Sequence, residues 1–376
     1  MKEFFKYIFV LSVFLTTACQ KQIISSDVIS AEGGLVSFST KVETKAPIIV
    51  DLYNHTFGVY GFGFSNLTQW GTVKAKATPN EFYNQLVSCD NTGACAYTYT
   101  PSSDEDPDSV ISGRKKWQLD QKYSFFAYYP YTTSNEGNYV ISSAATPEVP
   151  YVEYTLPLVK SGNSQDTYTV DPANLLDIMT AKVTDHSIVL GPVVGFNFYH
   201  RLFCIDVEGI NHDPNAVRVS DISLTISGIQ YNKSRIYMDR DRTVYDETLQ
   251  QEISQPSIPS SVNSFTKASS VTFSPIIPEN TNEVLLEQGV ETALSGGDNM
   301  IMLIPQNSEN EANALNVTVN FNKNGEAGSA STSFNIDFKE GRKYTLTMNF
   351  IGDEVQLITA SAANWDTTDD VDHIFD

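Results

Sequence analysis

Apolar and polar side chains alternate every two residues over many short segments of this chain. In the first such segment, 35–42, Val36 and Phe38 alternate with Ser37 and Ser39. This is the pattern of a β-strand with one buried face. The 21 Phe and 19 Tyr residues also favour half-buried pleated surfaces. Amphipathic helical patterns longer than two or three turns are hard to find, so an all-β protein is expected.

Turn signals separate these segments, which predicts many short antiparallel strands packed as β-sandwiches. Beyond the first, strands are expected at 57–64, 97–100, 123–129, 151–156, 196–207, 221–226, 271–273, 299–304, 315–321, 331–338, 343–351 and 355–365. One short helix is expected within 171–182. A length of 376 residues suits two domains of about 170 residues each. Pro192 interrupts the pattern, so we place the domains at 35–191 and 192–376.

Residues 1–18 have the pattern of an export signal. A basic start is followed by the apolar stretch 7–15 and by the small residues 16–18, immediately before Cys19. The apolar stretch is shorter than the ~20 residues that a membrane-spanning helix needs. We expect Cys19 to carry a lipid and 19–34 to be a polar tether. Three positions before the cysteine stands threonine instead of leucine, so a plain secretory signal is the alternative.

The chain is strongly acidic, with a formal net charge of −21. The signal contains Lys2, Lys6 and Glu3 and so has a net charge of +1. Without the signal, the net charge of the chain would be −22. Such a protein repels phosphate backbones and anionic lipid surfaces. Nucleic acid is therefore excluded as an expected partner.

Three cysteines follow Cys19. Cys89 and Cys95 flank a turn-forming stretch and can be bridged in an oxidising compartment. Cys204 lies in an apolar run, where a buried thiol is expected. No second cysteine pair and no suitably spaced histidine accompany them, so no metal site is predicted.

Catalytic signatures are missing from the sequence. It contains no His-Glu-x-x-His, no Gly-x-Ser-x-Gly and no phosphate-binding P-loop motif. The five histidines have no neighbours at ligand spacing, and His200 is interpreted as a structural residue. Carboxylates are abundant, but nothing singles out one pair for glycoside hydrolysis. We therefore expect no enzyme activity and no cofactor.

Several landmarks occur in a characteristic order along the chain. After the signal come the segments 44–46, 57–62, Trp117, 123–130, 175–179, 196–202, 302–306, 341–347 and Trp365. In this order and spacing the sequence resembles the fimbrillin family of Bacteroidetes, the subunits of type V pili.

This resemblance implies two tandem transthyretin-like β-sandwich domains after a lipoprotein signal. It also implies that the lipidated precursor reaches the outer membrane, where a surface protease removes the first strand, 35–42. The emptied groove then accepts a strand from another fimbrial subunit, as in strand addition generally. The C-terminal strand, 355–365, is the candidate donor.

One departure from the family concerns the processing site. Shaft subunits are cut after an arginine near this point, whereas this chain has Lys45, with Lys41 as the other basic residue nearby. An arginine-specific protease would cut after neither, because lysine and arginine differ in geometry. Shaft, anchor and tip roles therefore stay open. The alternative is a monomeric surface lipoprotein that binds glycan or host protein, with Trp70 or Tyr231 as an aromatic platform.

Overall fold

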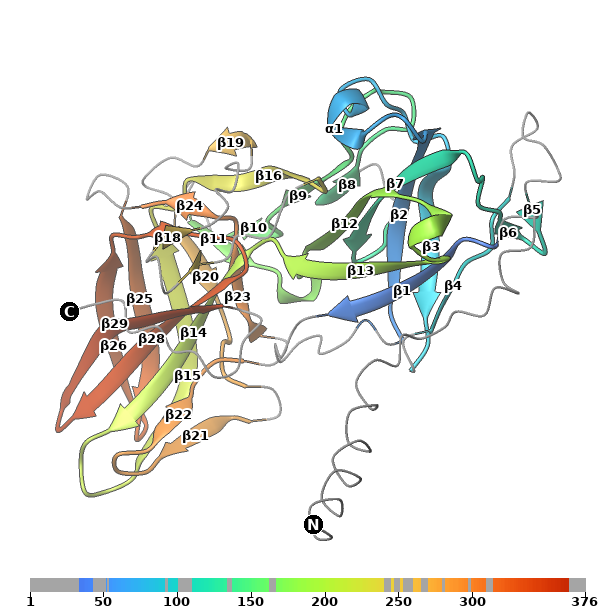
Figure 1. Cartoon of the computed structure of the whole chain (residues 1–376). Coiled ribbons are helices and arrows are strands. Elements are labelled where there is room, and N and C mark those ends of the chain that lie inside the picture. Colours follow the sequence, from blue (N-terminus) through green and yellow to red (C-terminus); the bar gives the residue numbers. More distant parts are fainter. Residues whose placement is uncertain are drawn as a thin grey trace, which may run out of the picture.

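The chain forms an all-β structure, as the sequence predicted (Figure 1). The computed structural model describes residues 34–364 except 43–51, 53, 92–93, 101–109, 134–136, 162–166, 240–244, 247–250, 253–259, 265–269, 279–280, 297–298 and 309–313. These residues form a closed barrel, a seven-stranded sheet, a five-stranded sheet, a four-stranded sheet and three two-stranded ribbons.

The barrel contains the first strand of the chain. Its order is β1 (Ser37–Val42), β13 (Val193–His200), β12 (Met179–His186), β7 (Gln121–Tyr129), β2 (Thr56–Ser65), β3 (Phe82–Cys89) and β4 (Ala94–Ala96). Within it β1 runs parallel to β13, and the other neighbours are antiparallel.

Strands β2 and β7 are buried on both faces, which explains their density of aromatic residues. Phe57 and Phe125 belong to the core inside the barrel. Tyr60 and Phe126 belong instead to the large core that extends through the rest of the molecule.

The four-stranded sheet covers this outer face of the barrel. Its order is β19 (Ser260–Ser264), β16 (Tyr231–Tyr237), β9 (Tyr151–Thr155) and β8 (Tyr139–Ile141). The ring of Tyr139 in β8 lies 6.1 Å from that of Tyr128 in β7.

We call the barrel the first unit. The two larger sheets share the large core and form the second unit, on the left in Figure 1. The seven-stranded sheet has the order β10 (Leu158–Lys160), β11 (Thr167–Val170), β20 (Ser270–Phe273), β15 (Val217–Ser227), β25 (Leu315–Lys323) and β26 (Glu326–Phe334), with β21 (Glu283–Leu286) also on β15. The five-stranded sheet has the order β22 (Glu291–Ala293), β14 (Phe203–Asn211), β28 (Arg342–Ile351) and β29 (Glu354–Asn364), with β23 (Ile301–Leu303) also on β14.

The remaining elements are short. The ribbons pair β5 (Val110–Ile111) with β6 (Arg114–Lys115), β17 (Tyr245–Asp246) with β18 (Gln251–Glu252), and β24 (Gln306–Asn307) with β27 (Asp337–Phe338). The helical turns in the described part of the chain include α1 (Trp70–Val73) and the 3₁₀ turns Pro172–Asn174 and Ile188–Leu190.

The prediction of a short helix within 171–182 is wrong. Asp171 caps a single 3₁₀ turn, Pro172–Asn174, by accepting a hydrogen bond from the backbone N–H of Ala173 at 3.2 Å. The chain then continues into β12, which begins at Met179 and pairs with β7 and β13. Tertiary strand pairing thus overrides a local apolar cluster that resembled a helix.

The expected domain boundary at Gly191 does not coincide with the division between the two units. Strands on each side of this position pair within the unit on the other side. Strand β13 follows this position but pairs with β1 and β12 in the barrel. Strands β10 and β11 precede it but lie in the seven-stranded sheet, where β11 pairs with β20. A division at Gly191 therefore separates strands from the sheets to which they belong.

Candidate functional site

The first strand occupies a slot between two strands that come from distant parts of the sequence. On one side β1 pairs with β13, in a register that places Ser37 opposite Val193 and Val42 opposite Phe198. On the other side Phe38 lies opposite Cys95 in β4. Because β1 is hydrogen-bonded on both sides, it completes the barrel.

The side chain of Phe38 in β1 and that of Val36, just before β1, fill an aromatic pocket inside the barrel. Phe38 is 3% exposed and Val36 is 1% exposed. The ring of Phe38 stacks on Phe196 at 5.7 Å and lies 5.3 Å from the ring of Tyr97. Phe82 and Phe125 contact the same ring, each with ring centres 5.7 Å away. Burial of one Phe or Val side chain stabilises a fold by about 1.5–3 kcal/mol, so these contacts hold β1 firmly.

The start of the strand is held by the segment 115–117. The backbone N–H of Val36 donates to the carbonyl of Lys115 at 2.8 Å, and that of Trp117 donates to the carbonyl of Gly34 at 2.9 Å. The hydroxyl of Tyr97 donates to the carbonyl of Val36 at 2.9 Å. The indole N–H of Trp117 donates to the carbonyl of Pro192 at 3.1 Å, which ties the start of β13 to the same place.

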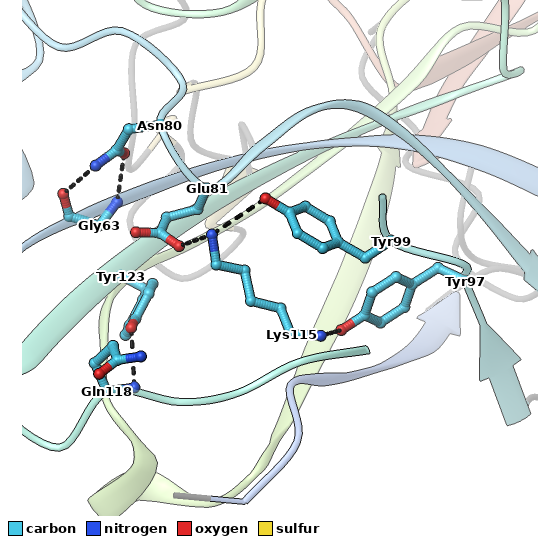
Figure 2. A network of polar contacts seen from close by, with 8 residues as sticks. All are labelled: Gly63, Asn80, Glu81, Tyr97, Tyr99, Lys115, Gln118 and Tyr123. Carbon is cyan, nitrogen blue, oxygen red and sulfur yellow. Dashed lines mark hydrogen bonds and ion pairs between the residues drawn. The ribbon is translucent and has the colours of Figure 1, made fainter. Parts of the chain in front are cut away.

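A buried lysine lies at this end of the slot (Figure 2). Lys115 is 5% exposed, and its ammonium lies 2.6 Å from a carboxylate oxygen of Glu81. The same ammonium is 3.4 Å from the hydroxyl of Tyr99 and 5.0 Å from the centre of its ring. Figure 2 shows the lysine side chain between these two residues. A buried charge needs such partners, because desolvation would otherwise be costly.

Tyr97 and Tyr123, near this lysine, stay neutral at physiological pH. Burial raises the pKa of Tyr97 to about 12, although hydrogen bonding to Lys115 opposes it. Burial, followed by the negative charge of Glu81, raises the pKa of Tyr123 as well. The Tyr123 hydroxyl accepts a hydrogen bond from the backbone N–H of Gln118 at 3.1 Å. These hydroxyls therefore act as fixed hydrogen-bonding groups.

The arrangement is suited to holding a strand. If β1 were removed, β13 and β4 would each present an unpaired edge, and the pocket of Phe38 would be empty. An open edge beside an apolar pocket is the surface to which an extended segment of another chain binds by strand addition.

The last described strand, β29, lies at an edge of the five-stranded sheet, where it pairs with β28. Val355 and Leu357 pack against the large core, whereas Ile358 is 47% exposed. A strand with one neighbour and a partly buried face can be exchanged more easily than a central strand.

The structure contains a disulfide between Cys89 and Cys95, which lie opposite each other in β3 and β4. The bridge forms part of the slot, because Cys95 lies opposite Phe38 and the Thr40 hydroxyl is 3.9 Å from the sulfur of Cys89. Cys204 is a buried free thiol.

The other expected site residues are placed only in part. Cys19 and Lys45 lie outside the described residues. Lys41 belongs to β1, with its backbone opposite Asn197 in β13.

Trp70, expected as an exposed binding platform, is 3% exposed and packs against Phe62 and Phe126. That expectation is wrong, because the side chain belongs to the core. Tyr231 is half-buried and packs against the same core.

His200 is buried, and its Nδ1 lies 2.8 Å from a carboxylate oxygen of Asp177. Next to it, the guanidinium of buried Arg201 donates to the hydroxyl of Thr180 at 2.6 Å and to the carboxylate of Glu340 at 2.9 Å. Thr180 belongs to the barrel and Glu340 precedes β28 in the second unit. These groups therefore join the two units.

Among the residues that the structure describes, no group of three or more His, Cys, Asp or Glu side chains could hold a metal ion. No helix in this part of the chain is long and apolar enough to cross a membrane.

Sequence reasoning missed the anchoring of β1 by 115–117. Lysine is usually exposed, so nothing marked Lys115 as buried. The aromatic cluster that surrounds it, with Tyr97 and Tyr99, was the available signal.

Comparison with known proteins gives the family. The family model described as fimbrillin-like matches residues 68–365, which is most of the chain. The chain belongs to the fimbrillin-like family. No curated protein matches this fimbrillin-like chain.

A solved structure agrees with the fold. A fimbrial protein from Bacteroides vulgatus superposes with a TM-score of 0.59 at 17% identity, covering 88% of this chain and 99% of its own. A putative cell adhesion protein from Bacteroides ovatus gives 0.49 at 13% identity, with 90% and 99% covered. At these identities the likeness concerns the fold alone.

Proposed function

We propose that this fimbrillin-like protein is a fimbrial subunit or a fimbria-associated adhesin at the cell surface, assembled with other subunits by strand exchange. Membership of the family supports the fimbrial role. The observation that carries the mechanism is the slot of β1, because its removal would leave two open strand edges and an empty pocket.

Export and anchoring complete the proposal. Lipidation at Cys19 would hold the precursor at the outer membrane, with 20–34 as a tether. Cleavage after Lys45, or after Lys41, would release the first strand, and β29 of another copy would take its place.

A gel experiment tests strand exchange. The mature protein is digested lightly with a trypsin-like protease, loss of the first strand is verified by mass, and the product is run unheated on a denaturing gel. We expect a ladder of multimers. An unchanged monomer after verified loss of residues up to Lys45 would contradict strand exchange.

A second candidate is favoured by Lys45, which stands where shaft subunits carry arginine. A chain that keeps its first strand would act as an anchor or as a monomeric surface lipoprotein that binds glycan or host protein. The N-terminal residue of the protein isolated from its own cell surface decides between the two: Cys19 indicates retention, and Val42 or Ala46 indicates cleavage.

A further inference from the structure

Exposed apolar side chains gather at two ends of the molecule. Eight of the twelve large hydrophobic residues exposed in the described part lie there, so they are not scattered as on an ordinary surface. The entrance surface, at the start of β1, comprises Leu67, Leu119, Val189, Leu190 and Val193. The tip surface, on the turns of the second unit, comprises Leu285, Val290 and Ile351.

The entrance surface surrounds the point where the first strand enters the barrel. Val189 and Leu190 are 85% and 70% exposed, and Val193 begins β13 opposite Ser37. The turns that carry Leu67 and Leu119 are joined by a hydrogen bond from the N–H of Asn66 to the carbonyl of Asp120 at 3.1 Å.

Hydrogen bonds likewise join the turns next to the tip surface. The N–H of Gly289 donates to the carbonyl of Asn211 at 2.8 Å. The N–H of His212 donates to the carbonyl of Phe350 at 2.9 Å. The N–H of Gly352 donates to the carboxylate of Asp213 at 2.9 Å. These bonds join the β14–β15, β21–β22 and β28–β29 turns, at the lower left of Figure 1, whereas β1 begins at the right.

The described charges at the two ends differ in net sign. Arg114, Lys116 and Lys122 lie at the entrance against Asp120, and Lys115 there is already paired with Glu81. The tip turns and the neighbouring β25–β26 turn carry Asp213, Glu287, Glu326, Asp353 and Glu354, against Lys323, and Arg218 there is already paired with Glu283. The acidic run 104–108 lies outside the described residues, so this comparison concerns the described side chains.

We propose that the tip surface of one copy docks on the entrance surface of a second copy, head to tail. This inference rests on the proposed strand exchange and adds the interface and its polarity. Strand β29 is attached to the body through the turn between Ile351 and Glu354, on the tip surface. Docking therefore brings that attachment to the mouth of the neighbour's slot. A contact between two different surfaces also continues into an open filament, unless its rotation closes a ring.

This geometry sets the direction of the donated strand. If β29 of one copy enters the neighbour's slot at the end where β1 begins, it would run in the same direction as β1. Its alternating residues Val355, Leu357 and Thr359 would then take the places of Val36, Phe38 and Thr40. The two patterns agree in residue type, with Leu for Phe as the one difference in size.

Charge reversal tests the docking in the full chain after light digestion. The entrance variant is Lys116→Glu with Lys122→Glu, the tip variant is Glu287→Lys with Glu326→Lys, and Lys160→Glu is the control on neither surface. Each variant alone should form about tenfold fewer multimers, and a mixture of the two should recover the ladder. Melting curves verify that each variant folds.

The outcomes separate this inference from the proposed function. A ladder that neither variant reduces, or that the mixture fails to recover, overturns the docking while strand exchange stands. No ladder from the unchanged protein overturns both. If Val189→Ser with Leu190→Ser abolishes binding to phosphatidylethanolamine vesicles but leaves the ladder intact, the entrance is a membrane contact and the docking is overturned.

Crosslinking tests the direction. A donor with Gln356→Cys should form a disulfide with an acceptor carrying Val193→Cys, since Val193 lies opposite Ser37. Asn197→Cys, opposite Lys41, is the matched control. Crosslinking to position 197 in place of 193 would contradict the direction of insertion.

Discussion

At the scale of single residues, Phe38 and Lys115 define the slot. Phe38 fills the pocket with its ring. The backbone carbonyl of Lys115 accepts a hydrogen bond from the N–H of Val36, and its ammonium is paired with Glu81. The sequence marked Phe38 through alternation. Nothing in it marked the lysine, whose burial depends on an acidic partner that only folding brings near.

Replacing Phe38 by alanine should weaken the hold on β1. Loss of a buried ring and the cavity left behind cost about 3–5 kcal/mol of unfolding free energy. Chemical unfolding measures this loss, and Ser39→Ala, whose side chain is half-buried, is the control within the same strand. A change below about 0.5 kcal/mol for Phe38→Ala would show that the pocket does not hold the strand.

Glu208 should make stability depend on pH. Burial, together with the nearby carboxylate of Glu291, raises the pKa of Glu208 from 4.5 to about 7. The native state therefore binds this proton more tightly than the unfolded chain. The stabilisation is complete below about pH 4.5 and is lost as the pH rises through about 7.

Glu208→Gln tests this pH dependence. The variant should be more stable than the unchanged protein above pH 7, by an amount on the order of 1 kcal/mol after allowance for solvent screening. The difference should shrink at pH 5. Melting temperatures at pH 5 and 8 measure it, with Glu326→Gln, exposed at the start of β26, as the control. Equal shifts at both pH values would rule out the titration of Glu208 as the cause.

At the scale of elements, the predicted strands are largely present. Strands β7, β9, β20 and β28 lie close to the expected ranges, because alternation and terminating turn residues are local properties. The range 196–207 is divided by Arg201 and Leu202 into β13 and β14, which belong to different units. The periodicity of the sequence gives no sign that the chain passes from one sheet to another, so this division could not be predicted.

At the scale of the whole molecule, the barrel and the second unit are joined by a buried ion pair. Arg201→Met would leave the carboxylate of Glu340 without its guanidinium partner. Removal of one partner of a buried pair costs about 3–5 kcal/mol, and chemical unfolding measures the loss. Arg201→Met combined with Glu340→Gln should cost less than the sum of the two single changes. Strict additivity would show that the pair is not coupled.

The amino-acid sequence by itself determined the all-β class, the positions of most strands and the candidate first strand, since all of these depend on neighbouring side chains. Tertiary structure alone decided the partner of each strand. The parallel pairing of β1 with β13, the strand at Met179–His186 and the burial of Trp70 and Lys115 all depend on contacts between residues far apart in the chain. The alternation of apolar and polar residues determines which face of a strand is buried. The free energy of closing the barrel determines which other strands that face packs against.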